Sequence, residues 1–120
     1  MIGNKLDIIE RGTIVQANLD PRRGSEESGH RPAVVVSATP MTAGPTVIVI
    51  PFTTSPRDRD RPYEVTLAPE ETGLPEQSTA LIQHIRVLDK RFILDRRRGR
   101  VVGSAMEKID AAIRRVLNVA

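Results

Sequence analysis

The side chains with the greatest capacity for chemistry lie in a long polar loop within residues 19–36, LDPRRGSEESGHRPAVVV. Pro21 and Gly24 end the apolar run before this loop, and Pro32 fixes the backbone as the chain enters the β-branched run 33–36. A hairpin connection needs only about 2–5 residues, so this loop is longer than topology requires. Polar loops on a rigid sheet commonly hold functional residues, although a solvated connection accounts equally well for the composition.

Two residues of this region and the next strand are suited to an anionic ligand. Arg31 stands where the loop re-enters an extended segment, and a guanidinium there can hold a phosphate and stabilise charge that develops on it. Thr53 stands at the matching end of the apolar run 46–52, where its hydroxyl could donate to the same oxyanion. The alternatives are an Arg31 paired with Glu26 or Glu27 and a Thr53 that caps a turn. The pair does not distinguish binding from cleavage.

The remaining titratable side chains offer weaker signals. Glu26 and Glu27 could act as a general base or merely hold the arginines. His30 would point away from Arg31 if the segment is already extended, because side chains alternate along a strand, and a mid-strand histidine such as His84 is more typical of structure than of catalysis. The sequence contains no phosphate-binding glycine motif, no HExxH and no Ser/His/Asp spacing.

Composition restricts the classes of protein that the chain can represent. Its 120 residues predict one domain, 1–120, and the absence of cysteine excludes disulfides and cysteine-ligated zinc. With two histidines, a histidine-rich metal site is not expected either, and neither is a cofactor. No apolar run approaches the roughly 20 residues of a membrane span, and no secretion signal is evident, so we expect a cytoplasmic protein without membrane contact.

Charge and aromatic content bear on the type of partner. The net charge is +3, and arginine clusters at 22–23, 57–61 and 96–100, which are either solvated faces or phosphate contacts. Aromatic residues are scarce, with one Tyr, two Phe and no Trp, so an RNA ligand would be held more by charge and hydrogen bonds than by stacking.

The hydrophobic pattern predicts a mainly β fold with one C-terminal helix, in the form of a small, partly open barrel. An N-terminal arm of about ten residues precedes it. The expected strands are 13–19, 33–37, 46–52, 63–67 and 78–88, although the alternation fails in the last of these. A helical turn over 89–93, a basic turn over 95–100 and a short strand at 101–102 follow. Ser104 and Glu107 form a potential capping box, with Ser104 as N-cap, for an amphipathic helix that reaches residue 118.

The loop sequence DPRRGSEESGHRPAVVVS (20–37) resembles the signature of the MazF/PemK/Kid family of toxin endoribonucleases, which reads DP, then GSEQ, a small spacer and RPA-V-V-S. The resemblance continues through VIVIPFTT (47–54), YEVTL (63–67) and ALIQHIRVLDKRFI (80–93). It implies an SH3-like barrel of the Kid/CcdB type that forms a homodimer. It also implies a metal-independent toxin, neutralised by a cognate antitoxin protein, that cuts single-stranded RNA at short sequences.

By this resemblance Arg31 and Thr53 match the catalytic Arg and Thr of the family, and Glu26 is the candidate base or Arg-orienting residue. The implied reaction is attack of a ribose 2′-OH on the adjacent phosphorus, which leaves a 2′,3′-cyclic phosphate and a 5′-OH end. The implied RNA-binding residues are Arg23, Ser25, His30, Thr54, Gln83, His84 and Arg86.

Two departures from the family pattern leave the cleavage sequence open. Glu27 and His84 each stand where glutamine is common in the family. The alternatives in function are a non-catalytic barrel that poisons gyrase as CcdB-like proteins do, and a housekeeping RNA-binding barrel.

Overall fold

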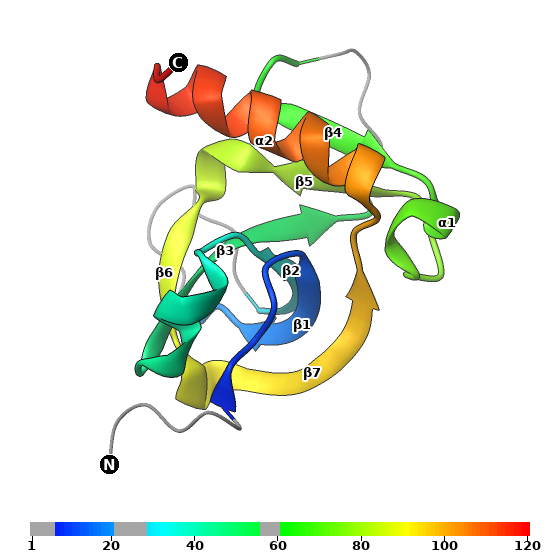
Figure 1. Ribbon diagram of the computed structural model, residues 1–120. Helices are drawn as coiled ribbons and strands as arrows, with labels where there is room; N and C mark the ends of the chain where they lie inside the picture. Colours follow the sequence, from blue (N-terminus) through cyan, green and yellow to red (C-terminus); the bar gives the residue numbers. More distant parts are fainter. Residues whose placement is uncertain (1–6, 21–28, 56–60) are drawn as a thin grey trace.

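The computed structural model describes residues 7–20, 29–55 and 61–120. Within them the chain forms an antiparallel sheet and a long C-terminal helix (Figure 1), which confirms the predicted mainly β fold. The strands are β1 (Thr13–Asn18), β2 (His30–Val35), β3 (Thr46–Thr53), β4 (Glu64–Leu67), β5 (Ser78–Leu81), β6 (Arg86–Asp89) and β7 (Ile93–Arg100). The helices are α1 (Pro69–Thr72) and α2 (Gly103–Leu117), and 3-10 turns form η2 (Thr39–Ala43), η3 (Ile82–His84) and η4 (Lys90–Phe92).

The eight-residue strand β3 is the central connection of the sheet. The strand order is β4-β5-β3-β2-β1-β7, and β6 also pairs with β3. The first half of β3, residues 46–49, pairs with β6, whereas Phe52 and Thr53 pair with β5. Since η4 links β6 to β7 and β7 pairs with β1, strands β1, β2, β3, β6 and β7 curve around a common interior. This arrangement agrees with the expected small barrel.

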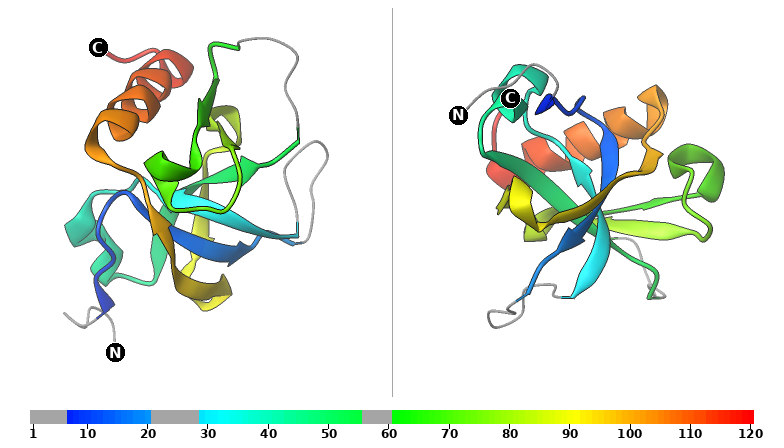
Figure 2. Two further views of the ribbon diagram at one scale, coloured as in Figure 1. Left: turned by 90° about the vertical axis from the view of Figure 1, so that its right-hand side faces the viewer. Right: turned by 90° about the horizontal axis from the view of Figure 1, so that it is seen from below.

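Alternation along the strands divides the core into two parts, because successive residues of a strand face opposite sides of the sheet. One part fills the barrel and the other lies beneath α2, which covers the sheet beside β4 and β5 (Figures 1 and 2). The barrel interior contains Ile9, Val15, Ala17, Leu19, Ala33, Val35, Val47, Val49 and Leu88. The second part includes Ile14, Val34, Ile50, Phe52, Leu67, Ala80 and Ile82, with Ala105, Ile109 and Ala112 of α2.

Helix α2 starts one residue before the predicted start of 104, and the predicted capping box is wrong. Ser104 lies inside the first turn, and the N-cap is Val102, without a side-chain cap. The Val102 N–H donates to the carbonyl of Glu71 at 3.1 Å, and the Val102 carbonyl accepts from Met106 N at 2.8 Å. A tertiary contact to α1 therefore sets the start of the helix. Its end lies where the periodicity predicts, and Asn118 closes it in a left-handed conformation with φ 55°.

The predicted single strand over 78–88 is instead two strands with different partners. Residues 78–81 form β5 between β3 and β4, η3 interrupts the chain, and residues 86–89 form β6 on the barrel side of β3. The Ile85 N–H donates to the Ile82 carbonyl at 3.1 Å within this break. Alternation fails here because the chain moves from one part of the sheet to the other.

The predicted basic turn over 95–100 and the short strand at 101–102 are also wrong. These arginines belong to β7, which pairs with β1 through an irregular register, and residues 101–102 are not a strand. A strand of the sequence Asp-Arg-Arg-Arg-Gly-Arg shows little apolar alternation, because all of its side chains are partly or fully exposed. The helical turn expected over 89–93 is present as η4.

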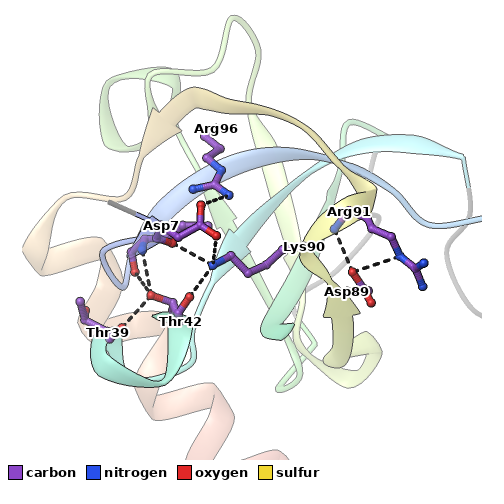
Figure 3. A network of polar contacts seen from close by, with 8 residues as sticks. Asp7, Thr39, Thr42, Asp89, Lys90, Arg91 and Arg96 are labelled. Carbon is purple, nitrogen blue, oxygen red and sulfur yellow. Dashed lines mark hydrogen bonds and ion pairs between the residues drawn. The ribbon is translucent and has the colours of Figure 1, made fainter. Parts of the chain in front are cut away.

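Lys90 and Asp7 hold the start of the described chain against η2 and β7 (Figure 3). The Lys90 ammonium, with only 8% of its side chain exposed, donates to the carbonyls of Asp7 (2.9 Å) and Thr42 (2.7 Å). It also lies 3.2 Å from the Asp7 carboxylate. The Asp7 carboxylate also meets Arg96 at 3.2 Å. Thr42 completes the contact, because its hydroxyl accepts from Ile9 N at 2.8 Å. The predicted N-terminal arm is therefore anchored from residue 7 onward.

Across the described ranges, neither helix has the length and apolar content that a membrane crossing requires.

Candidate functional site

Arg31 and Thr53 lie at facing ends of neighbouring strands. Strand β2 pairs with β3 through Ala33 with Pro51 and Val34 with Ile50. This pairing ends at Ala33 and Pro51; if the register continued for two more residues along each strand, Arg31 would lie opposite Thr53, and both residues line the same cleft. Side chains alternate along a strand, so Arg31 and Thr53 are on the same strand faces as Ala33 and Val49, which point into the barrel interior. Arg31 and Thr53 therefore lie at the end of the barrel's apolar core.

A cleft of about 370 Å³ opens at these strand ends, within the size range of small ligand sites. The structure brings four of the predicted site residues together here, namely His30, Arg31, Thr53 and Thr54. His30 and Arg31 both line the cleft, although they are neighbours on a strand. Among the described residues, the lining is Gly29, His30, Arg31, Pro32, Phe52, Thr53, Thr54 and Ser78.

The hydroxyl group of Thr53 is both buried and oriented. Thr53 is 5% exposed, and its Oγ1 accepts a hydrogen bond from the backbone N–H of Ser55 at 3.2 Å. The turn-capping alternative for Thr53 is therefore realised. Thr53 can still donate to an oxyanion, since a hydroxyl that accepts one hydrogen bond retains its own proton for donation.

Ser78 also lines the cleft, although the sequence does not predict it as a site residue. It lies at the start of β5, is 3% exposed, and its Oγ donates to the Glu76 carbonyl at 2.9 Å. A single serine at the start of a strand carries no sequence signal of a site. Only the pairing of β5 with the end of β3 brings it to the cleft.

Three other predicted RNA-binding residues lie outside this cleft. Gln83 and His84 belong to η3, where the side-chain amide of Gln83 donates to the Glu64 carboxylate at 3.2 Å. Arg86, at the start of β6, lines a second cleft of about 300 Å³. The predicted residues Arg23, Ser25 and Glu26, and the neighbouring Glu27, lie outside the described residues. In the described part of the chain, His, Asp and Glu form no cluster of three or more with the arrangement of a metal site.

Comparison with known families assigns the chain. The model of PemK-like and MazF-like toxins of type II toxin–antitoxin systems matches residues 10–117, which include β1 to α2 and both strand ends of the cleft. The chain belongs to this family. The resemblance noted in the loop sequence is thereby confirmed over nearly the whole chain.

Individual members of the PemK/MazF family match at similar length. Endoribonuclease MazF9 of Mycobacterium tuberculosis is 37% identical over 112 residues, which cover 89% of this chain and 94% of that protein. The crystal structure of MazF from Deinococcus radiodurans superposes with a TM-score of 0.78 at 25% identity, over 93% of this chain and 98% of that one. A mycobacterial endoribonuclease in complex with its cognate antitoxin shares the fold, with a TM-score of 0.75 at 23% identity, over 92% and 96% of the two chains.

Proposed function

We propose that this chain is a sequence-specific endoribonuclease, the toxin component of a type II toxin–antitoxin pair, and that it cuts single-stranded RNA at the cleft between β2 and β3. The observation that carries the proposal is that Arg31 and Thr53 line one cleft at the ends of β2 and β3, in a chain that matches the toxin family over residues 10–117. Relatives that carry the name endoribonuclease support the reaction class.

The reaction is a transesterification within the RNA strand. The ribose 2′-oxygen attacks the adjacent phosphorus, a P–O2′ bond forms, and the P–O5′ bond breaks. The products are a 2′,3′-cyclic phosphate and a 5′-OH end. The guanidinium of Arg31 and the hydroxyl proton of Thr53 stabilise the negative charge on the non-bridging oxygens of the pentacoordinate intermediate, as preorganised donors do in other phosphoryl reactions.

Two proton transfers complete the reaction. The 2′-OH loses its proton to a base, and the leaving 5′-oxygen gains one. The protonated guanidinium of Arg31 is available as an acid and not as a base: it passes a proton to the leaving oxygen as the P–O5′ bond breaks and regains one from water. Glu26 is the candidate base by its match to the family motif, with Glu27 as the neighbouring alternative. No metal ion is required for these steps, which is the reason to include EDTA in the assay.

The partners follow from the family and its members. A cognate antitoxin protein binds and neutralises the toxin; a mycobacterial endoribonuclease of the same fold is found in complex with its cognate antitoxin. The active form is a homodimer, in agreement with several exposed apolar side chains, among them Val119 at 56% and Leu117 at 54%. Light scattering on the purified protein will give its mass in solution. An RNA substrate implies that the protein acts in the cytoplasm.

The decisive experiment incubates the purified protein with single-stranded RNA in EDTA and maps the ends of the products. We expect cyclic phosphate and 5′-OH termini at a restricted set of sequences. The Arg31→Ala variant should cut at least about 100-fold more slowly, since loss of one such donor costs about 10²–10³ in rate. Absence of cleavage by the unmodified protein, or full activity of Arg31→Ala, would contradict the proposal.

A further inference from the structure

A second cleft, of about 300 Å³, lies between the end of β1 and the segment β6–η4. Except for Arg86, none of its residues has a role in the reaction or in the predicted RNA contacts. Within residues 7–20, 29–55 and 61–120, the residues that line it are Asn18, Asp20, Arg86, Val87, Leu88, Asp89 and Phe92. We propose that this cleft binds one amino-bearing base of the RNA beside the cleaved linkage, and so helps to set the cleavage sequence. The inference rests on the proposed function.

The first argument is an aromatic ring that is exposed and held in place. Phe92 is 41% exposed, and the guanidinium carbon of Arg91 lies 5.4 Å from the centre of its ring. Arg91 is in turn fixed by Asp89, whose Oδ1 accepts from Arg91 N at 2.9 Å and lies 3.4 Å from Arg91 Nε (Figure 3). Single-stranded RNA is commonly recognised by bases that stack on such rings.

The second argument is the polar chemistry of the cleft. One oxygen of each polar side chain is engaged within the protein: Asn18 Oδ1 accepts from Asp20 N (3.0 Å), Asp20 Oδ1 from Gly29 N (2.9 Å), and Asp89 Oδ1 from Arg91 N. These bonds orient the side chains. Each carboxylate has a second oxygen that accepts hydrogen bonds, and the Asn18 amide nitrogen donates.

Two carboxylates beside an aromatic ring favour a base with an exocyclic amino group. A carboxylate accepts from the amino group of cytosine N4 or adenine N6, and the Asn18 amide nitrogen can donate to adenine N7. Uracil has no exocyclic amino group for the two carboxylates, and its carbonyl oxygens can be met only by the donors of Asn18 and Arg86. The cleft therefore favours cytosine or adenine over uracil.

The third argument is the position of this cleft relative to the first. Asn18 is the Cα partner of His30, which lines the candidate catalytic cleft. Neighbouring strands lie about 4.8 Å apart. The two clefts are therefore one strand apart where Asn18 faces His30. On the other side, Arg86 pairs with Val49 of β3, the strand that ends at Thr53. A single RNA strand can therefore place a phosphate in one cleft and an adjacent base in the other.

The test compares cleavage profiles on a random pool of single-stranded RNA. The Phe92→Ala variant should lose about tenfold of the preference for cytosine or adenine over uracil at one position beside the cut. It should keep the preferences at other positions, and Phe92→Trp should restore the lost one. Tyr63→Ala is the matched control, because Tyr63 is also an exposed aromatic residue, at 46%, and lines neither cleft. A Phe92→Ala profile equal to that of the unmodified protein would overturn the proposal.

A crosslinking experiment separates this proposal from the proposed function. RNA with 5-iodocytidine and a 2′-O-methyl group at the cut linkage resists cleavage and crosslinks to adjacent aromatic residues on irradiation. We expect the crosslink on the peptide that contains Phe92. Cleavage of normal RNA without this crosslink would overturn the base site alone. A crosslink without cleavage would overturn the nuclease and support the base site. An unchanged RNA profile in Phe92→Ala, together with lost antitoxin binding, would overturn the base site in favour of a protein contact.

Discussion

The Oγ1 atom of Thr53 accepts a hydrogen bond from the backbone N–H of Ser55 at 3.2 Å, inside the cleft that Arg31 lines. The bond fixes the side-chain rotamer and directs the hydroxyl proton toward another acceptor. Thr53 is thus held as a donor before any substrate is present. Preorganised donors of this kind contribute more to a reaction than mobile ones, because no reorganisation accompanies the charge development.

Substitution of Thr53 tests this donor directly. Thr53→Val keeps the shape of the side chain but removes the hydroxyl, and we expect RNA cleavage to fall by about 100-fold. Thr53→Ser keeps the hydroxyl and should retain most of the activity. Rates measured at saturating RNA, with thermal unfolding as a check of the fold, distinguish the two. Equal activity of the valine and serine variants would show that the hydroxyl takes no part in catalysis.

The contact between Gln83 and Glu64 predicts a positioning role for the carboxylate. An ionised carboxylate only accepts hydrogen bonds, so the NH₂ group of Gln83 must face Glu64 and its oxygen is presented outward. If Gln83 contacts RNA, Glu64→Ala and Gln83→Ala should each lower kcat/KM by about fivefold. The double variant should lose no more than either single variant, as expected of residues that act as a unit. Fully additive losses would contradict the coupling.

Acid should weaken the anchor at the start of the chain. The hydrogen bond and the charge of Lys90, with a further contribution from Arg96, lower the pKa of Asp7 below its ordinary value, near 3.9. A lowered pKa in the folded state means that Asp7 stabilises the fold above the unfolded-state pKa, and that this contribution is lost as the pH falls through the folded-state pKa. Urea unfolding should show Asp7→Asn less stable than the unmodified protein at pH 7, and the gap should shrink at pH 3. An equal gap at both pH values would exclude the mechanism.

Gly99 predicts a strong steric effect at a position without unusual backbone geometry. A Cβ atom at Gly99 would collide with the carbonyl oxygen of Thr72, so β7 and α1 could not keep their present contact. We expect Gly99→Ala to lower the free energy of unfolding by about 1–3 kcal/mol. Gly103→Ala is the control, since no atom lies within 4 Å of a Cβ built there. Denaturant unfolding of the two variants gives the comparison, and equal stability would contradict the packing argument.

The sequence predicts those helices and strands that form because of the pattern of their own side chains. The helical period of Ile109 and its neighbours defines α2, and the apolar run of β3 defines a strand that is almost fully buried. Arg31 and Thr53 were found because each stands at the end of such a run. Elements that depend on distant partners were missed: the change of partner within 78–88, the arginine-rich strand β7, and the helix start set by the bond from Val102 to Glu71. Ser78 was missed for the same reason, because only strand pairing brings it to the cleft.

Strand β3 belongs to both parts of the core, and this affects how the protein unfolds. Residues 46–51 bond to β6 and β2 around the barrel, and Phe52 and Thr53 bond to β5 beside α2. Neither part of the core can separate from the other without breaking this strand, so both should unfold in a single cooperative transition. Amide hydrogens of β3 should exchange only through that global event, whereas those at helix ends exchange by fraying. The backbone structure of the cleft rim at Thr53 is then lost only when the core itself unfolds.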